Sequence, residues 1–172
     1  MIRHLTPADY TTMPWANGKG STIEMLREDG PEGLKWRLSR ASVVENGPFS
    51  LFAGIERNLT VLTGPGFDLV GDGVHLTARP LVPVTFAGDI ALRAEGVTAP
   101  SDDFNVMTAR SLPRPEVAVL TGRAQVPAGG VLAVYALLPT VVNGRAMGAQ
   151  DLILTEAAIR VDGQVVVVRL LS

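Results

Sequence analysis

The sequence predicts an all-β protein with very little helix, built as a sandwich or a barrel. Many short runs have strand composition, and glycine or proline stands in nearly every gap between them. Aromatic residues make up only 5% of the chain, so the core must be built from Val, Leu, Ile and Ala. Branched side chains favour strands, and many short strands at regular spacing are typical of sandwiches and barrels.

The expected strands follow one another along the whole chain. Their ranges are 21–27, 34–44, 58–63, 66–70, 73–77, 84–86, 90–94, 104–109, 117–120, 131–137, 151–155 and 159–170. One short helical turn is expected near the N-terminus, because Thr6 can cap a helix that has Pro7 at its first position. Within the last run, Asp162-Gly163 predicts a tight hairpin turn.

Composition and charge exclude several classes of protein. A chain of 172 residues with 47% hydrophobic and 19% charged residues is long and apolar enough for one compact unit, and it is not disordered. A net charge of -2 without a basic cluster argues against nucleic acid as a partner. The absence of cysteine excludes disulfides and thiolate sites. The start has no signal-peptide core, and no apolar run is long enough to span a membrane, so we expect a cytoplasmic protein without a membrane partner.

The segment PWANGKGSTIE, residues 14–24, has the composition of a binding loop. It places Trp15, Asn17 and Glu24 around Gly18 and a second glycine, just before an expected strand. Glycine lets a backbone turn tightly or approach a ligand, and the polar side chains supply hydrogen-bond donors and acceptors. The alternative is an ordinary Asn-Gly turn between two elements.

Two later segments carry similar features, namely GPFSLFAGIERNLTVLTGPG at 47–66 and DFNVMTAR at 103–110. Together with 14–24, they make the chain resemble the bacterial HutD/Ves family over nearly its whole length. Two positions depart from the family pattern: Lys19 stands where a third glycine is common, and Arg40 stands where a strand residue is usually apolar.

The resemblance implies a bicupin of the RmlC-like cupin superfamily, in which two jelly-roll β-barrels pack as one unit. No internal repeat is visible in the residues themselves. The expected halves are 1–112 and 113–172, because Pro113 and Pro115 interrupt the strand pattern there. The family resemblance leaves open an exchange of strands between the two halves. The edge strands of cupin barrels often pair across a two-fold axis, so a homodimer is the expected oligomer.

The chain lacks the residues of a conventional cupin metal site. Such a site needs several histidines that converge with a carboxylate, but the chain has two histidines, His4 and His75, far apart in the sequence. Surface or packing roles suit both better. We therefore expect no bound metal and no cofactor.

Arg57 is the leading candidate for a ligand-binding cation. Strand alternation places it on an apolar face, and a buried guanidinium needs an anionic partner. That partner is either a ligand or a structural ion pair with Glu24 or Asp103. By the same alternation Arg37 and Ser39 share one face and line the cavity, although Ser39 also suits a small packing position. No Gly-x-Ser-x-Gly motif surrounds Ser39, which argues against a nucleophile.

Three more residues complete the predicted site. Asn105 lies on the more polar face of its strand and is the better ligand contact, whereas Phe104 belongs to the packing. Glu24 is the acid–base candidate, because it is a carboxylate within a strand just past the glycine-rich loop. Trp15 either stacks on a planar ligand or plugs the end of the barrel.

These residues predict a metal-free cupin that binds a small anionic carboxylate metabolite. Arg57 and Arg37 would hold the carboxylate, while Asn17, Glu24 and Asn105 recognise its polar remainder. The family resemblance implies a regulatory or accessory role in histidine utilisation, with urocanate or formylglutamate as natural ligands. The alternative is a metal-free epimerase-like or isomerase-like enzyme that uses Glu24 as acid or base. A structural or protein-interaction module is the third reading.

Overall fold

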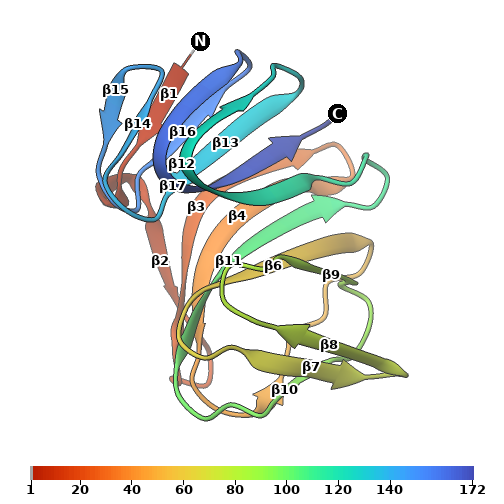
Figure 1. Ribbon diagram of the computed structural model, residues 1–172. Coiled ribbons are helices and arrows are strands. Elements are labelled where there is room, and N and C mark those ends of the chain that lie inside the picture. Colours follow the sequence, from red (N-terminus) through yellow and green to blue (C-terminus); the bar gives the residue numbers. More distant parts are fainter. Residues whose placement is uncertain (1) are drawn as a thin grey trace. The chain divides into compact units, whose positions relative to one another are not determined.

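A computed structural model describes residues 2–172, and strands make up most of it (Figure 1). The all-β prediction is confirmed. The one helical element in the described residues is the short 3-10 helix η1 (Pro7–Asp9), capped by Thr6 as the sequence predicts. The backbone N–H of Thr6 donates to Oδ2 of Asp9 at 2.8 Å, which ties the two ends of this turn together. No helix within residues 2–172 has the length and apolar character needed to cross a membrane.

The chain forms two compact units. One, here called the 113–172 unit, contains Pro113–Ser172 together with the N-terminal segment up to Tyr10. The other, the 11–112 unit, contains Thr11–Leu112. The first strand of the chain is therefore part of the unit that is otherwise built from the C-terminal third.

The 113–172 unit is a seven-stranded antiparallel sheet (Figure 1). Its core consists of the aliphatic side chains that alternate along the central strands, such as Leu132, Val134, Ile153, Val165 and Val167. The strand order is β1 (Ile2–Leu5), β16 (Leu152–Thr155), β13 (Val131–Ala136), β17 (Ile159–Leu170), β14 (Thr140–Val142) and β15 (Arg145–Met147), with β12 (Glu116–Val126) also paired to β17.

The hairpin predicted at Asp162-Gly163 is wrong. Strand β17 runs without a break through this dipeptide, and β12 pairs with it along its length, with Gly122 opposite Gly163. A Cβ on Gly163 would collide with the side chain of Thr140. The glycine therefore permits a close approach of a neighbouring strand, and it does not turn the chain.

The 11–112 unit contains two sheets that share one hydrophobic core (Figure 1). Leu59 and Val61 from the larger sheet pack with Phe67 and Leu69 from the smaller one. The larger sheet has the order β2 (Thr11–Pro14), β3 (Ser21–Gly30), β4 (Gly33–Val43), β11 (Ser101–Ala109), β6 (Ile55–Thr63) and β9 (Val84–Ala87). The smaller sheet has the order β5 (Gly47–Pro48), β10 (Arg93–Glu95), β7 (Phe67–Gly71) and β8 (Val74–Ala78).

The turn Gly64-Pro65-Gly66 fixes the start of β11. Gly64 has a φ of 87°, and a Cβ there would collide with the backbone carbonyl of Pro100. The backbone N–H of Gly66 donates to the hydroxyl of Ser101 at 2.9 Å. Two glycines thus hold this turn against the first residue of β11, two positions before Asp103.

Candidate functional site

Strands β4, β11 and β6 bring the predicted site residues onto one face of the larger sheet. In an antiparallel sheet, residues that are paired across strands point to the same side. The register therefore stacks three rows on that side, namely Arg37–Met107–Arg57, Ser39–Asn105–Leu59 and Ala41–Asp103–Val61. The alternation read from the sequence thus holds across three strands.

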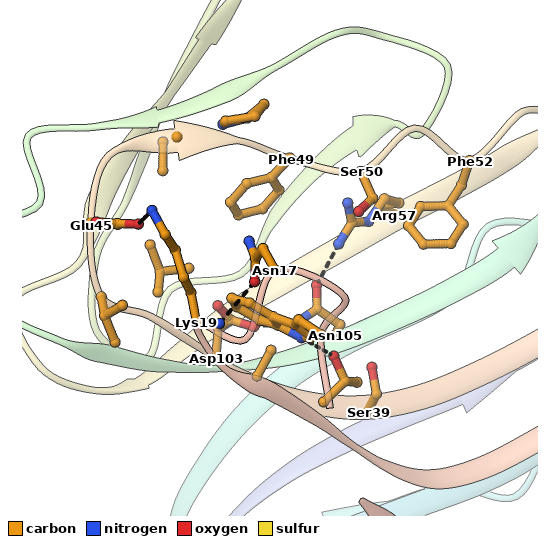
Figure 2. Close-up of a pocket in the computed structure, with 18 of the residues that line it drawn as sticks. Asn17, Lys19, Ser39, Glu45, Phe49, Ser50, Phe52, Arg57, Asp103 and Asn105 are labelled. Carbon is orange, nitrogen blue, oxygen red and sulfur yellow. Dashed lines mark hydrogen bonds and ion pairs between the residues drawn. The ribbon is translucent and has the colours of Figure 1, made fainter. Parts of the chain in front are cut away.

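This face opens into a pocket of about 590 Å³ within the 11–112 unit (Figure 2). The loop before β3 and the segment from the end of β4 to Phe52 complete its wall. Six of the eight predicted site residues line it, namely Trp15, Asn17, Arg37, Ser39, Arg57 and Asn105. The other two, Gly18 and Glu24, lie outside the lining.

Arg57 is a buried cation within an aromatic cage. Arg57 is only 6% exposed. Its Nη2 donates a hydrogen bond to Oδ1 of Asn105 at 3.0 Å (Figure 2). The guanidinium carbon lies 5.0, 5.2 and 5.4 Å from the ring centroids of Phe86, Phe52 and Phe49. These are cation–π distances. Nε is buried without a hydrogen-bond partner.

Neither of the ion-pair partners considered for Arg57 reaches it. None of the ion pairs within residues 2–172 includes Arg57, and Glu24 pairs elsewhere. Burial lowers the pKa of Arg57 to about 10, and the negative charge of Asp103 offsets part of this effect. The guanidinium therefore lines the pocket with unused hydrogen-bonding capacity.

Asp103 lines the pocket, whereas the sequence predicts it only as an ion-pair partner of Arg57. It is 2% exposed, and its Oδ1 accepts a short hydrogen bond from Nδ2 of Asn105. Burial raises the pKa of Asp103 to about 7, against the opposing effects of the Asn105 bond and the Arg57 charge. The signal that identifies it is alternation, since Asp103 and Asn105 are two residues apart on one strand.

Glu24 forms an ion pair with Arg37. Nε of Arg37 donates to Oε2 of Glu24 at 2.6 Å, and the two side chains are 11% and 18% exposed. Glu24 on β3 is paired in register with Ser39 on β4, so the Glu24–Arg37 ion pair connects two neighbouring strands. The positive charge of Arg37 is therefore neutralised within the sheet, in contrast to that of Arg57.

The glycine-rich loop is closed by its own hydrogen bonds. The backbone N–H of Trp15 donates to the carbonyl of Gly20 at 2.9 Å, and the N–H of Gly18 donates to the carbonyl of Trp15 at 3.0 Å. The indole Nε1 of Trp15 donates to the hydroxyl of Thr22 at 2.9 Å. A Cβ on Gly20 would lie 2.9 Å from the indole ring, so this glycine makes room for the tryptophan. The ring is thus held by the loop while it lines the pocket.

Lys19 links this loop to the opposite wall of the pocket. Its Nζ lies 2.7 Å from Oε1 of Glu45, just beyond β4, and both side chains are more than half exposed (Figure 2). Its backbone N–H donates to Oδ1 of Asn17 at 2.9 Å. The residue that departs from the family pattern therefore contributes an exposed ion pair at the pocket.

Neither histidine is among the residues that line this pocket. Nε2 of His4 contacts Oδ2 of Asp151 at 2.8 Å in the 113–172 unit, and Nε2 of His75 contacts Oδ2 of Asp68 at 3.1 Å in the 11–112 unit. Across residues 2–172, no group of three or more histidine, cysteine or acidic residues is arranged to hold a metal ion.

Comparison with known sequences relates the chain to bacterial proteins. A model of the HutD family matches residues 7–166. An uncharacterised 21.2 kDa protein from the hutC 3′ region of Pseudomonas putida is 40% identical over 113 residues, which are 63% of this chain and 58% of that protein. Protein Ves from Cronobacter sakazakii is 37% identical over 134 residues, 72% of each chain. The matched region thus spans little more than half of the P. putida protein.

Comparison with solved structures extends the similarity to the whole chain. HutD from Pseudomonas fluorescens SBW25, determined in a formate condition, has a TM-score of 0.88 at 33% identity and covers 99% of this chain and 98% of its own. A conserved protein of unknown function from Pseudomonas aeruginosa PAO1 has a TM-score of 0.86 at 31% identity, with full coverage of both chains. The cupin-like pirin YhhW from Escherichia coli, in complex with nickel(II), reaches 0.69 over 99% of both chains at 11% identity, and this likeness shows the fold alone. The predicted cupin fold is confirmed.

Proposed function

The chain belongs to the HutD family, and we propose that it is a metal-free cupin that binds a small carboxylate metabolite in the pocket of its 11–112 unit. We place its role in the cytoplasm, as a regulatory or accessory protein of histidine utilisation. The position of the P. putida relative in the hutC 3′ region supports this setting. Urocanate and formylglutamate are the first ligands to test.

The observation that carries the proposal is the state of Arg57. A guanidinium has five N–H donors and prefers a planar, bidentate acceptor. Within the described residues, the side-chain hydrogen bond of Arg57 goes to a neutral amide, and Nε has none. A buried cation without an anionic partner is costly. A ligand carboxylate at this wall of the pocket would supply the missing charge and the missing acceptor.

The rest of the lining suits a small polar metabolite. A pocket of about 590 Å³ is within the usual range for small-molecule sites. Ser39 and Asn17 offer hydrogen-bonding groups, and Trp15 offers an aromatic face. The ion pair with Glu24 holds Arg37 in place, so we assign Glu24 a positioning role rather than direct ligand contact.

Thermal unfolding in the presence of candidate ligands tests the proposal. Urocanate or formylglutamate should raise the melting temperature, because a ligand at a hundred times its Kd stabilises the folded state by about 2.7 kcal/mol. Nucleotides and neutral sugars should not. Arg57→Met should abolish the shift, whereas Arg123→Met, a change at an arginine that is 90% exposed in the other unit, should retain it. A carboxylate shift that survives in Arg57→Met would contradict the proposal.

An enzymatic role is the second candidate, and Asp103 favours it. A pocket carboxyl with a pKa of about 7 can take up or release a proton at neutral pH. This makes Asp103 a better acid–base candidate than Glu24, whose carboxylate is bound by Arg37. Long incubation of each stabilising carboxylate, followed by NMR of the small molecule, separates the two functions. Conversion that is lost in Asp103→Asn would replace the binding role by catalysis, and an unchanged compound would exclude catalysis on that compound.

A further inference from the structure

The charges in and beside the pocket balance in pairs only when Asp103 is ionised. Arg37 is paired with Glu24 at 2.6 Å, and Lys19 is paired with Glu45 at 2.7 Å. Arg57 remains, and the neighbouring acidic side chain in the lining is Asp103. When Asp103 is ionised, its negative charge offsets that of Arg57 at a distance, without a direct ion pair. A bound carboxylate would add a second negative charge beside the same cation.

Asn105 couples these two groups. Its Oδ1 accepts from Nη2 of Arg57, and its Nδ2 donates to Oδ1 of Asp103. Arginine can only donate, so the amide orientation is fixed by Arg57, and the amide then presents its N–H group to Asp103. All three residues are at least 94% buried, so water screens their charges weakly.

We infer that the pocket takes up its carboxylate ligand together with one proton, and that Asp103 holds this proton. The inference rests on the proposed function. It adds that the ligand binds as the carboxylate anion while one proton binds to the protein, so the net charge of the pocket does not change. Protonation balances the charge, because Arg57 then faces one anion, the ligand. It also turns Asp103 into a donor that can reach a ligand oxygen.

The surroundings of Asp103 support a proton at this position. Burial holds the pKa of Asp103 near 7, so it is half protonated under neutral conditions even before an anion arrives. Directly opposite it lie the apolar side chains of Val61 and Ala41. The charged groups of the lining besides Asp103 are Arg57 on β6, Arg37 on β4, and Lys19 and Glu45 on the loops. Outside the lining, Glu24 on β3 pairs with Arg37, and Asp102 next to Asp103 on β11 acts on it through its negative charge. None of them is a histidine, and Asp103 is the one acid of the described lining that is buried and has no cationic ion-pair partner, so we assign the proton to it.

Formate is the probe for a direct test, since it is the smallest carboxylate and stays ionised from pH 6 to pH 8. Its Kd is measured by NMR titration of the backbone amides at both pH values and constant ionic strength. If the anion binds only when Asp103 is protonated, the binding-competent fraction falls from about 0.9 to about 0.1, and Kd rises about tenfold from pH 6 to pH 8. Equal Kd values at the two pH values would overturn the inference.

Two variants separate the proton from other effects of pH. Asp103→Asn is neutral at every pH and has nearly the shape of the protonated acid, so its Kd should be independent of pH and close to the wild-type value at pH 6. Asp102→Asn removes the same charge from the adjacent residue, which bonds to Ser42, and it should keep the tenfold change. A tenfold change that persists in Asp103→Asn would assign the proton to another group and overturn the inference.

The carboxyl carbon of Asp103 gives a readout that needs no variant. In ¹³C NMR its titration midpoint should lie near 7 in the free protein and rise when formate is present. A midpoint that formate leaves unchanged would overturn the inference on its own. Formate binding without any pH dependence would be consistent with the carboxylate-binding function and would contradict only the uptake of a proton. A complete failure of formate and the other carboxylates to bind would overturn both.

Discussion

Arg57→Met should change the free energy of unfolding by less than about 2 kcal/mol, although it removes a buried charge. Met keeps the apolar length of the side chain inside the cage of Phe49, Phe52 and Phe86 while it removes the charge and every donor. A small effect is unusual for a buried arginine. It follows here because Arg57 is not half of a buried ion pair within the described residues.

The magnitude is the difference between opposing terms. Burial lowers the pKa of Arg57 from the ordinary value of a guanidinium to about 10, and this difference corresponds to a cost of about 3 kcal/mol for the charged form. The sign is unfavourable to folding below pH 10, because the folded state holds the proton less tightly than the unfolded chain. Met relieves that cost. The Arg57→Met variant also loses the hydrogen bond to Asn105, worth about 1.5 to 3 kcal/mol, and cation–π contacts worth about 2 kcal/mol. These losses exceed the relieved cost by less than about 2 kcal/mol.

Chemical denaturation of the unliganded variants measures the outcome, with Arg37→Met as the comparison. Arg37 is somewhat more exposed than Arg57, but its loss leaves the carboxylate of Glu24 without its partner. Breaking a buried pair from one side costs up to about 3 to 5 kcal/mol, and the partial exposure of this pair reduces that figure. We therefore expect Arg37→Met to be the more destabilising change. A larger loss in Arg57→Met would refute the view that Arg57 awaits an external anion.

Three further outcomes are expected. Asp103→Asn should remove a pH dependence of the free energy of unfolding. In the wild type, the raised pKa of Asp103 stabilises the folded state by about 4 kcal/mol below about pH 4, and this contribution is lost as the pH rises through 7. Denaturation of both proteins at several pH values measures the difference. Gly163→Ala should lower the melting temperature more than Gly122→Ala, because alanine would be strained at the positive φ of both positions, but only the Cβ added at 163 collides with Thr140. Lys19→Ala should cost less than about 1 kcal/mol, since its ion pair is more than half exposed, and the difference should shrink at high salt.

Local periodicity predicted which side chains of the candidate site share a face. Alternation along a strand depends on backbone geometry alone, so the sequence placed Arg37 with Ser39, and Arg57 on an inward face. The structure brings these residues into one pocket with Asn105, because their three strands are neighbours in register. The same rule also selects Asp103, two residues before Asn105. Its role was harder to see because its raised pKa arises from burial, which depends on the tertiary packing.

Contacts between distant segments could not be read from the sequence. Glu24 and Arg37 become partners because β3 and β4 pair in a particular register, and that register contains irregularities next to Glu24. The short strand β1 forms because a distant partner, β16, is available, so its own four residues carry little signal. The role of Gly163 could not be predicted for the same reason, since a glycine in the sequence indicates a turn or a close approach of another strand equally well. Only the presence of Thr140 on a neighbouring strand distinguishes the two.

The difference between the two pocket arginines explains why one of them is suited to bind an anion. Arg37 and Arg57 occupy the two ends of one cross-strand row, with Met107 between them. The strand beyond Arg37 is β3, which supplies Glu24 as a partner, whereas the strand beyond Arg57 is β9, which supplies Phe86 directly opposite. An aromatic ring attracts a cation without neutralising it. The sheet therefore satisfies one arginine and leaves the other charged and open to the pocket, and this asymmetry is the structural basis of the proposed carboxylate site.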